Sequence, residues 1–118
     1  MRRAFLVSLL GLLLAACASA SASQTQRFSG TWDWHFETSA FTTDAGEGPY
    51  WLAGDGAVWD QLSAPFSESG PWGRAHLIVE GRLSPPGQYG HLGAYSRELR
   101  VTRVMEAREV PLGESSVH

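Results

Sequence analysis

Four side chains able to bind a metal ion occupy the polar positions of two alternating segments. Asp33, His35 and Glu37 alternate with apolar residues over 28–37, and His76 has the same position in a later run. Imidazole and carboxylate groups are ligands for Zn²⁺ and other divalent metals. Side chains two residues apart on a strand are separated by about 6.5–7 Å, so such a site requires both segments to pair. One hypothesis is therefore a small metal-binding protein or enzyme; the alternative is a solvated polar face, which has the same alternation.

Aromatic residues of the loops indicate a different kind of site, one that binds without catalysis. Trp72 lies in a loop rich in Gly and Pro, where no periodicity requires a tryptophan, and Tyr89 and Tyr95 flank a glycine-rich segment. Trp72 either closes one end of the domain or forms a ligand platform with the two tyrosines, on which a sugar ring can stack. Trp32 and Trp34 have the apolar parity of a strand, so we expect them to pack in the core.

The N-terminal segment has the composition of an export signal. The charged start Met1-Arg2-Arg3 precedes an apolar run over 4–14, and small residues follow it. This run is shorter than the roughly 20 residues that span a bilayer, and its length is typical of a signal peptide. The sequence Leu14-Ala15-Ala16-Cys17 that ends it resembles the lipobox of bacterial lipoproteins.

The resemblance implies diacylglycerol on Cys17, cleavage after residues 1–16 and acylation of the new N-terminus. Since Ala18 rather than Asp follows the cysteine, it also implies the periplasmic face of the outer membrane if the cell is Gram-negative. Two or more acyl chains hold a protein stably at a bilayer. Cys17 is the only cysteine, so lipidation excludes a disulfide, and no cofactor is expected beyond this lipid. The alternative is an ordinary secretory signal cleaved near Ala20 or Ala22.

The rest of the chain reads as a tether followed by one domain. Residues 17–27 are rich in Ala, Ser and Gln, which is typical of a flexible linker. A single β domain is expected over 28–112, followed by a disordered tail over 113–118, because 118 residues allow one domain.

Alternating apolar and polar residues predict a mainly β domain. Strands are expected over 28–37, 50–53, 74–83 and 98–108, with 38–43 continuing the first strand. Residues 57–62 are expected to form a short helix that ends before Pro65. A break in parity near Arg103 indicates a β-bulge. Four or five strands with one short helix fit a small OB-like barrel, and a lone twisted sheet or a different small barrel is the alternative.

The charge argues against nucleic acid as a partner. The chain has nine Arg, no Lys and twelve Asp and Glu; loss of Arg2 and Arg3 leaves seven against twelve, a net charge of −5. Such a protein lacks the basic stripe that binds phosphates. The common catalytic signatures Gly-x-Ser-x-Gly, His-Glu-x-x-His, the P-loop and paired Cys-x-x-Cys are absent. We therefore expect a lipid-anchored envelope protein that is a non-catalytic binding or assembly module for a glycan, a peptide or another protein.

Overall fold

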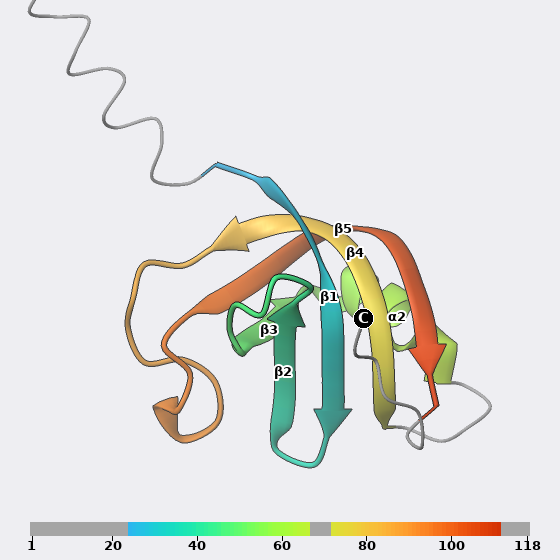
Figure 1. Ribbon diagram of the computed structural model, residues 1–118, viewed down its shortest axis with the longest axis horizontal. Coiled ribbons are helices and arrows are strands. Elements are labelled where there is room, and N and C mark those ends of the chain that lie inside the picture. The colour runs from blue at the N-terminus through green and yellow to red at the C-terminus, as the bar shows by residue number, and fades with distance from the viewer. Residues whose placement is uncertain (1–23, 67–71, 112–118) are drawn as a thin grey trace, which may run out of the picture.

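The computed structural model describes residues 24–66 and 72–111 and shows a closed barrel of five strands (Figure 1). The strands are β1 (Gln26–His35), β2 (Thr38–Thr43), β3 (Tyr50–Gly54), β4 (Gly73–Leu83) and β5 (Glu98–Val110). Their order around the barrel is β1-β2-β3-β5-β4, and β4 pairs with β1 to close it. Only β3 and β5 are parallel among these pairs. The predicted mainly β, OB-like barrel with one short helix is confirmed.

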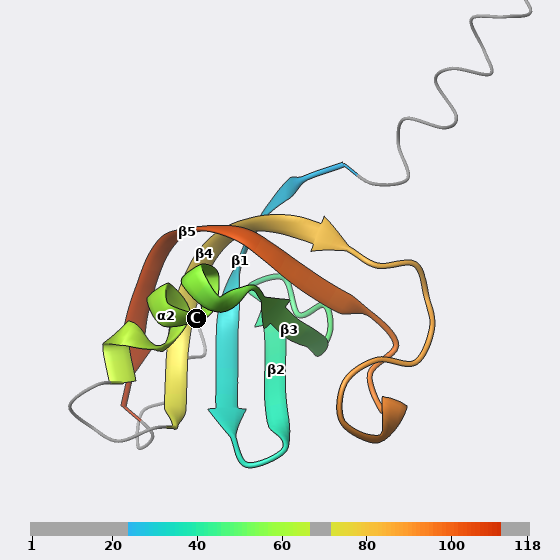
Figure 2. The same cartoon turned by 180° about the vertical axis from the view of Figure 1, so that it is seen from behind.

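One short helix connects β3 to β4. It is α2 (Gly56–Ser63), continued by the 3₁₀ helix η3 (Ala64–Phe66); a second 3₁₀ helix, η4 (His91–Gly93), lies in the loop between β4 and β5. Asp55 caps α2, since its Oδ1 accepts a hydrogen bond from the Val58 backbone N–H at 3.0 Å. The helix contacts β3 and β5 (Figure 2), and the helix predicted over 57–62 is confirmed.

The core consists of the inward-facing side chains of the strands and of the α2–η3 segment. Trp32 is fully buried at its centre, stacked on Trp34 at a ring distance of 5.4 Å, with Trp59 edge-on to Trp32 at 5.5 Å. The prediction of core packing is therefore confirmed for Trp32, whereas Trp34 is partly buried and packs against the core. The apolar parity predicted for β4 is also confirmed, because the buried residues of that strand are Ala75, Leu77, Val79 and Gly81.

The first predicted strand is in fact a hairpin. β1 ends at His35, Phe36 and Glu37 form the turn, and Thr38 pairs back with His35. The prediction that 38–43 continues the first strand is wrong, because the turn lacks the Gly or Asn that usually marks a two-residue connection. Glu37 adopts the left-handed conformation there, with φ of 61°. As a result Phe36, expected on the apolar side of the strand, is 68% exposed.

The irregularity predicted near Arg103 is confirmed. The β4–β5 register shifts between Ile78 and Val79 and again between Glu80 and Gly81, on both sides of the pair Glu80–Arg103. The strand predicted to start at residue 28 begins at Gln26. The predicted signal peptide, the lipobox with Cys17 and the tail over 113–118 lie outside the described residues. Among the described residues, no helix has the length and apolar character needed to cross a membrane.

One buried hydroxyl inside the barrel generates the first prediction. The Trp32 indole N–H donates to Ser39 Oγ at 2.9 Å, and Ser39 Oγ donates to the Leu52 carbonyl at 2.9 Å. Ser39→Ala removes the hydrogen bond of the Trp32 indole N–H and the one to the Leu52 carbonyl. We therefore expect the free energy of unfolding to fall by about 1–3 kcal/mol. Urea denaturation measures it, with Ser63→Ala on the surface of α2 as a control expected to change it by less than about 0.5 kcal/mol. Equal losses in the two variants would contradict this role of Ser39.

Candidate functional site

The structure does not gather the four predicted metal ligands into one site. β1 and β4 do pair, as the hypothesis required, but Asp33 forms an ion pair with Arg74 at 2.6 Å, and His76 lies opposite Thr31. Glu37 belongs to the hairpin turn, and His35 is the last residue of β1. In residues 24–66 and 72–111, no three His, Cys, Asp or Glu side chains are arranged to hold a metal ion.

His76 instead belongs to a polar cluster on the outer surface of the barrel. Its Nε2 lies 3.2 Å from both carboxylate oxygens of Asp44, a residue that follows β2, and 3.5 Å from Ser29 Oγ on β1. Ser29 Oγ donates a shorter hydrogen bond to Asp44 Oδ2, at 2.6 Å. The cluster joins three segments that are 15 to 47 residues apart in the chain, and sequence spacing gave no sign of it.

These three residue types also form hydrolytic triads, but their geometry here differs. In a triad the imidazole bonds the serine through one ring nitrogen and the aspartate through the other. Here Ser29 and Asp44 both lie at Nε2 of His76, while Nδ1 is buried without a hydrogen-bond partner among the described residues. The serine proton is directed at the carboxylate, so the imidazole is not placed to accept it. The cluster fastens β1 and the end of β2 to β4 and does not activate a nucleophile.

Trp72 lies at the end of the barrel where β1 turns into β2. It directly precedes β4 and is 49% exposed, and its ring centroid is 6.4 Å from that of Phe36. About half of its surface is buried and half remains in solvent, so closure of the barrel end and a ligand platform both stay predictions for Trp72. Phe36 was not predicted as a site residue, since its apolar parity indicated the core.

The loop between β4 and β5 brings a third exposed apolar side chain to this end. His91 Nε2 is 3.1 Å from Glu37 Oε2 in the β1–β2 turn, which ties η4 to that turn. The next residue, Leu92, is 90% exposed and has a φ of 57°. Gly90 allows the loop to pack closely, because a Cβ atom there would lie 2.4 Å from the ring of Trp51. No sequence periodicity marks Leu92, so it was missed.

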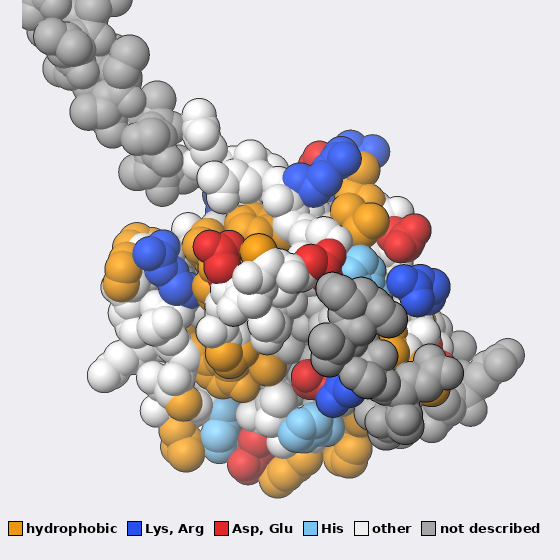
Figure 3. Space-filling model, viewed as in Figure 1, with side chains coloured by type: hydrophobic (Ala, Val, Ile, Leu, Met, Phe, Trp, Pro, Cys, Tyr) orange, Lys and Arg blue, Asp and Glu red, His pale blue; other side chains and the backbone are white. Residues whose placement is uncertain are grey.

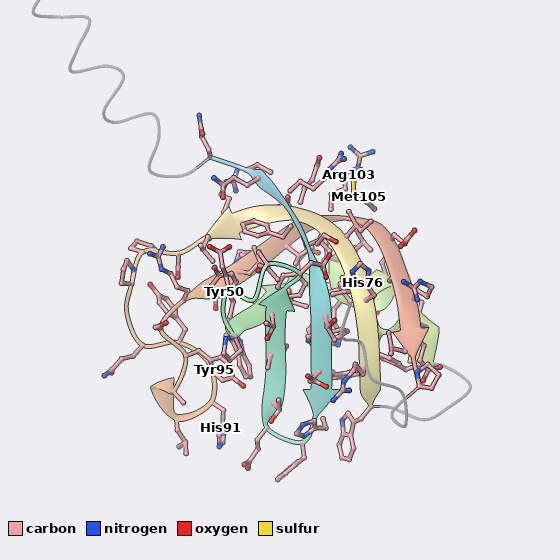
Figure 4. All side chains as sticks on the ribbon, viewed as in Figure 1. Tyr50, His76, His91, Tyr95, Arg103 and Met105 are labelled. Carbon is pink, nitrogen blue, oxygen red and sulfur yellow. The ribbon has the colours of Figure 1, made fainter. Side chains whose placement is uncertain are left out.

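We call Phe36, Trp72 and Leu92 the apolar rim. Of the described residues, the only other large hydrophobic side chain that is exposed is Met105, at 38%. Hydrophobic and histidine side chains gather along this lower edge (Figure 3), where His91 is labelled in Figure 4. The rim lies at the C-terminal end of β1. The N-terminal end of β1, where the described chain starts, is about 30 Å from the rim, which is the length of a ten-residue strand.

The two predicted ligand tyrosines have contacts within their own loop. Tyr89 pairs with Tyr95 through backbone hydrogen bonds, and its hydroxyl donates to the Pro85 carbonyl at 2.9 Å. The Tyr95 ring packs edge-on to Trp51 at 5.2 Å, beside β3 (Figure 4). The structure therefore does not join the two tyrosines to Trp72 in one platform; they fix the shape of the loop that carries Leu92.

The Ser29–Asp44–His76 cluster generates a prediction about titration. The hydrogen bond from Ser29, opposed by partial desolvation and assisted by His76, holds the pKa of Asp44 below its usual value of 3.8. A lowered carboxyl pKa stabilises the fold above the usual value, and this contribution is lost as the pH falls through the folded-state pKa. We expect Ser29→Ala to raise the pKa of Asp44, measured by NMR titration of its carboxyl carbon. Thr31→Ala on the same strand is the control, and an unchanged pKa in Ser29→Ala would contradict the assignment.

The fold and these contacts are the basis for any functional argument, because sequence and structure comparisons add none. The chain has no significant match among protein-family models, curated proteins or solved structures.

Proposed function

We propose that the chain is a lipid-anchored protein of the cell envelope and that its apolar rim binds a peptide segment of another envelope protein without catalysis. The observation that carries the proposal is the rim itself. Three separate segments of the chain each bring one exposed apolar side chain, Phe36, Trp72 and Leu92, to one end of the barrel. Exposed apolar side chains gathered at one end of a domain are typical of surfaces that bind other proteins, and aromatic residues are enriched in such interfaces.

The conformation of Leu92 supports a role in binding. A left-handed conformation costs a non-glycine residue about 1–2 kcal/mol, and Leu92 recovers little of this by burial because it is 90% exposed. The fold alone therefore gives no reason for a leucine at this position. A partner that covers the side chain does, since full burial of a leucine contributes about 1.5–3 kcal/mol.

The make-up of the rim favours a peptide over a glycan. A sugar ring stacks on a flat aromatic face, whereas Leu92 has none and the rings of Phe36 and Trp72 are inclined by 55° to each other. Glu37 Oε2 and His91 Nε2, 3.1 Å apart, belong to residues that are next in the chain to Phe36 and Leu92, and they offer polar groups for a peptide backbone. A branched aliphatic group and two inclined rings at one end of the barrel suit the apolar side chains of a peptide.

The position of the rim fits an anchor at Cys17. β1 begins at Gln26, only nine residues after the proposed lipidated cysteine, and runs away from that end for about 30 Å. A domain tethered in this way is held close to the bilayer at the start of β1. The rim at the other end then faces away from the membrane, towards partners in the same compartment.

A photo-crosslinking amino acid placed at single sites in living cells tests the proposal. At Leu92 or Phe36 we expect one adduct of discrete mass that contains another protein. Gln61, which is exposed on α2 away from the rim, is the matched control and is expected to give none. The Trp72→Ser variant should reduce the Leu92 adduct at least about fivefold, as expected for an interface aromatic residue worth more than 1 kcal/mol.

Stability separates loss of binding from loss of fold. Because Asn tolerates the left-handed conformation, Leu92→Asn is expected to keep or slightly raise the free energy of unfolding while weakening the partner contact measured from Phe36. Equal adducts from Gln61 and Leu92 would contradict a binding rim. Adducts that contain only glycan would contradict the peptide version.

A further inference from the structure

Four arginines lie together on the outer surface near the start of β1. Arg27 is the second residue of β1, and the register places it opposite Glu80 on β4, which is opposite Arg103 on β5. Two residues further along β4 from Glu80, Arg82 is opposite Arg100 on β5. The side chains of Arg27, Arg100 and Arg103 are 57–68% exposed. We call the four residues the arginine patch.

The patch has more positive than negative charge. Glu80 serves two of the arginines, at 3.7 Å from Arg27 and 3.9 Å from Arg103, and Glu98 lies 4.0 Å from Arg100. Arg27, Arg100 and Arg103 together with these two carboxylates give a formal charge of +1. An anion that bound the exposed guanidinium groups of Arg27, Arg100 and Arg103 would neutralise this excess positive charge.

The rest of the barrel is acidic. Outside the patch and its two carboxylates, the described residues have three arginines and eight Asp or Glu, a formal charge of −5. The net charge of the chain therefore hides a separation between a basic end and an acidic remainder. Arg103 and Met105 lie at the upper edge in Figure 4, the edge at which β1 begins in Figure 1. The shifts in register around Arg103 interrupt the ladder at this point.

We propose that the arginine patch binds the phosphate groups of anionic lipids and so orients the barrel on the membrane that holds it. Guanidinium groups match phosphate oxygens in bidentate geometry. Each arginine near an anionic bilayer contributes favourably to binding, and the attraction is screened by salt. Met105, which is 38% exposed beside the patch, adds an apolar group for the lipid interface. The orienting role rests on the proposed lipid anchor, whereas the phosphate site does not.

The chemical reactivity of each arginine tests this proposal. The full chain is reconstituted in vesicles of phosphatidylcholine alone or with phosphatidylglycerol, treated with an arginine-specific dicarbonyl reagent, and mapped by mass spectrometry. We expect Arg100 and Arg103 to react about fivefold more slowly on the anionic vesicles, and 0.5 M NaCl to remove the difference. Arg108 is the internal control, because it is exposed on the same strand but opposite His76; its rate is expected to be unchanged.

Two further arms separate the possible causes. Flotation with the neutral vesicles reports the anchor alone. A chain that floats with them, but whose patch arginines react no more slowly on the anionic vesicles, overturns this proposal and leaves the anchor intact. A chain that floats only with anionic vesicles, and is released by salt, supports the patch and contradicts the anchor. If inorganic phosphate protects Arg100 and Arg103 from the dicarbonyl reagent to the same extent as the anionic vesicles, the membrane version of the proposal is overturned. The double variant Arg100→Gln, Arg103→Gln gives a last test. If Arg27 and Arg82 still react as slowly on the anionic vesicles as they do in the wild-type chain, the proposal is also overturned.

Discussion

The barrel depends on the placement of one polar group, the indole N–H of Trp32. This side chain fills the centre of the barrel and is fully buried, so its N–H needs a partner inside the protein. Ser39 Oγ accepts the hydrogen bond of this N–H and donates its own to the Leu52 carbonyl. The hydrogen bonds connect β1, β2 and β3 at the centre, where Trp34, Trp59 and other rings pack around them. A domain without an internal disulfide obtains its order from this packed and satisfied core.

A closed barrel has two ends and no free sheet edge, and the two ends of this one differ chemically. Near the start of β1 lies the arginine patch, where exposed guanidinium groups outnumber carboxylates. At the other end the β1–β2 turn, the residue before β4 and η4 form the apolar rim, held by the Glu37–His91 pair and the Phe36–Trp72 contact. In our proposal the first end faces the bilayer and the second faces a partner. In this proposal the lipid attaches the domain, the arginine patch orients it and the apolar rim binds the partner.

The sequence predicted the parts of the fold that follow from periodicity. The alternation of apolar and polar residues in the sequence predicted the buried face of β4. Interruptions of this alternation predicted the short helix and the irregularity near Arg103. The hairpin at Phe36 was missed because its turn lacks the usual Gly or Asn, and the left-handed residue is Glu37. Of the rim, only Trp72 was predicted, since an exposed Leu92 in an irregular loop has no periodic signal. Contacts between segments far apart, such as the ion pairs, depend on register and closure, which the sequence does not display.

We propose that lipid on Cys17 attaches this domain to a membrane, and metabolic labelling with palmitate tests this attachment most directly. We expect palmitate label on the wild-type chain and none on Cys17→Ser. We also expect a high-salt wash to release Cys17→Ser from membranes, because salt screens the attraction through the arginine patch. An unlabelled wild-type chain, or a Cys17→Ser variant that remains with the membranes after this wash, would contradict the account.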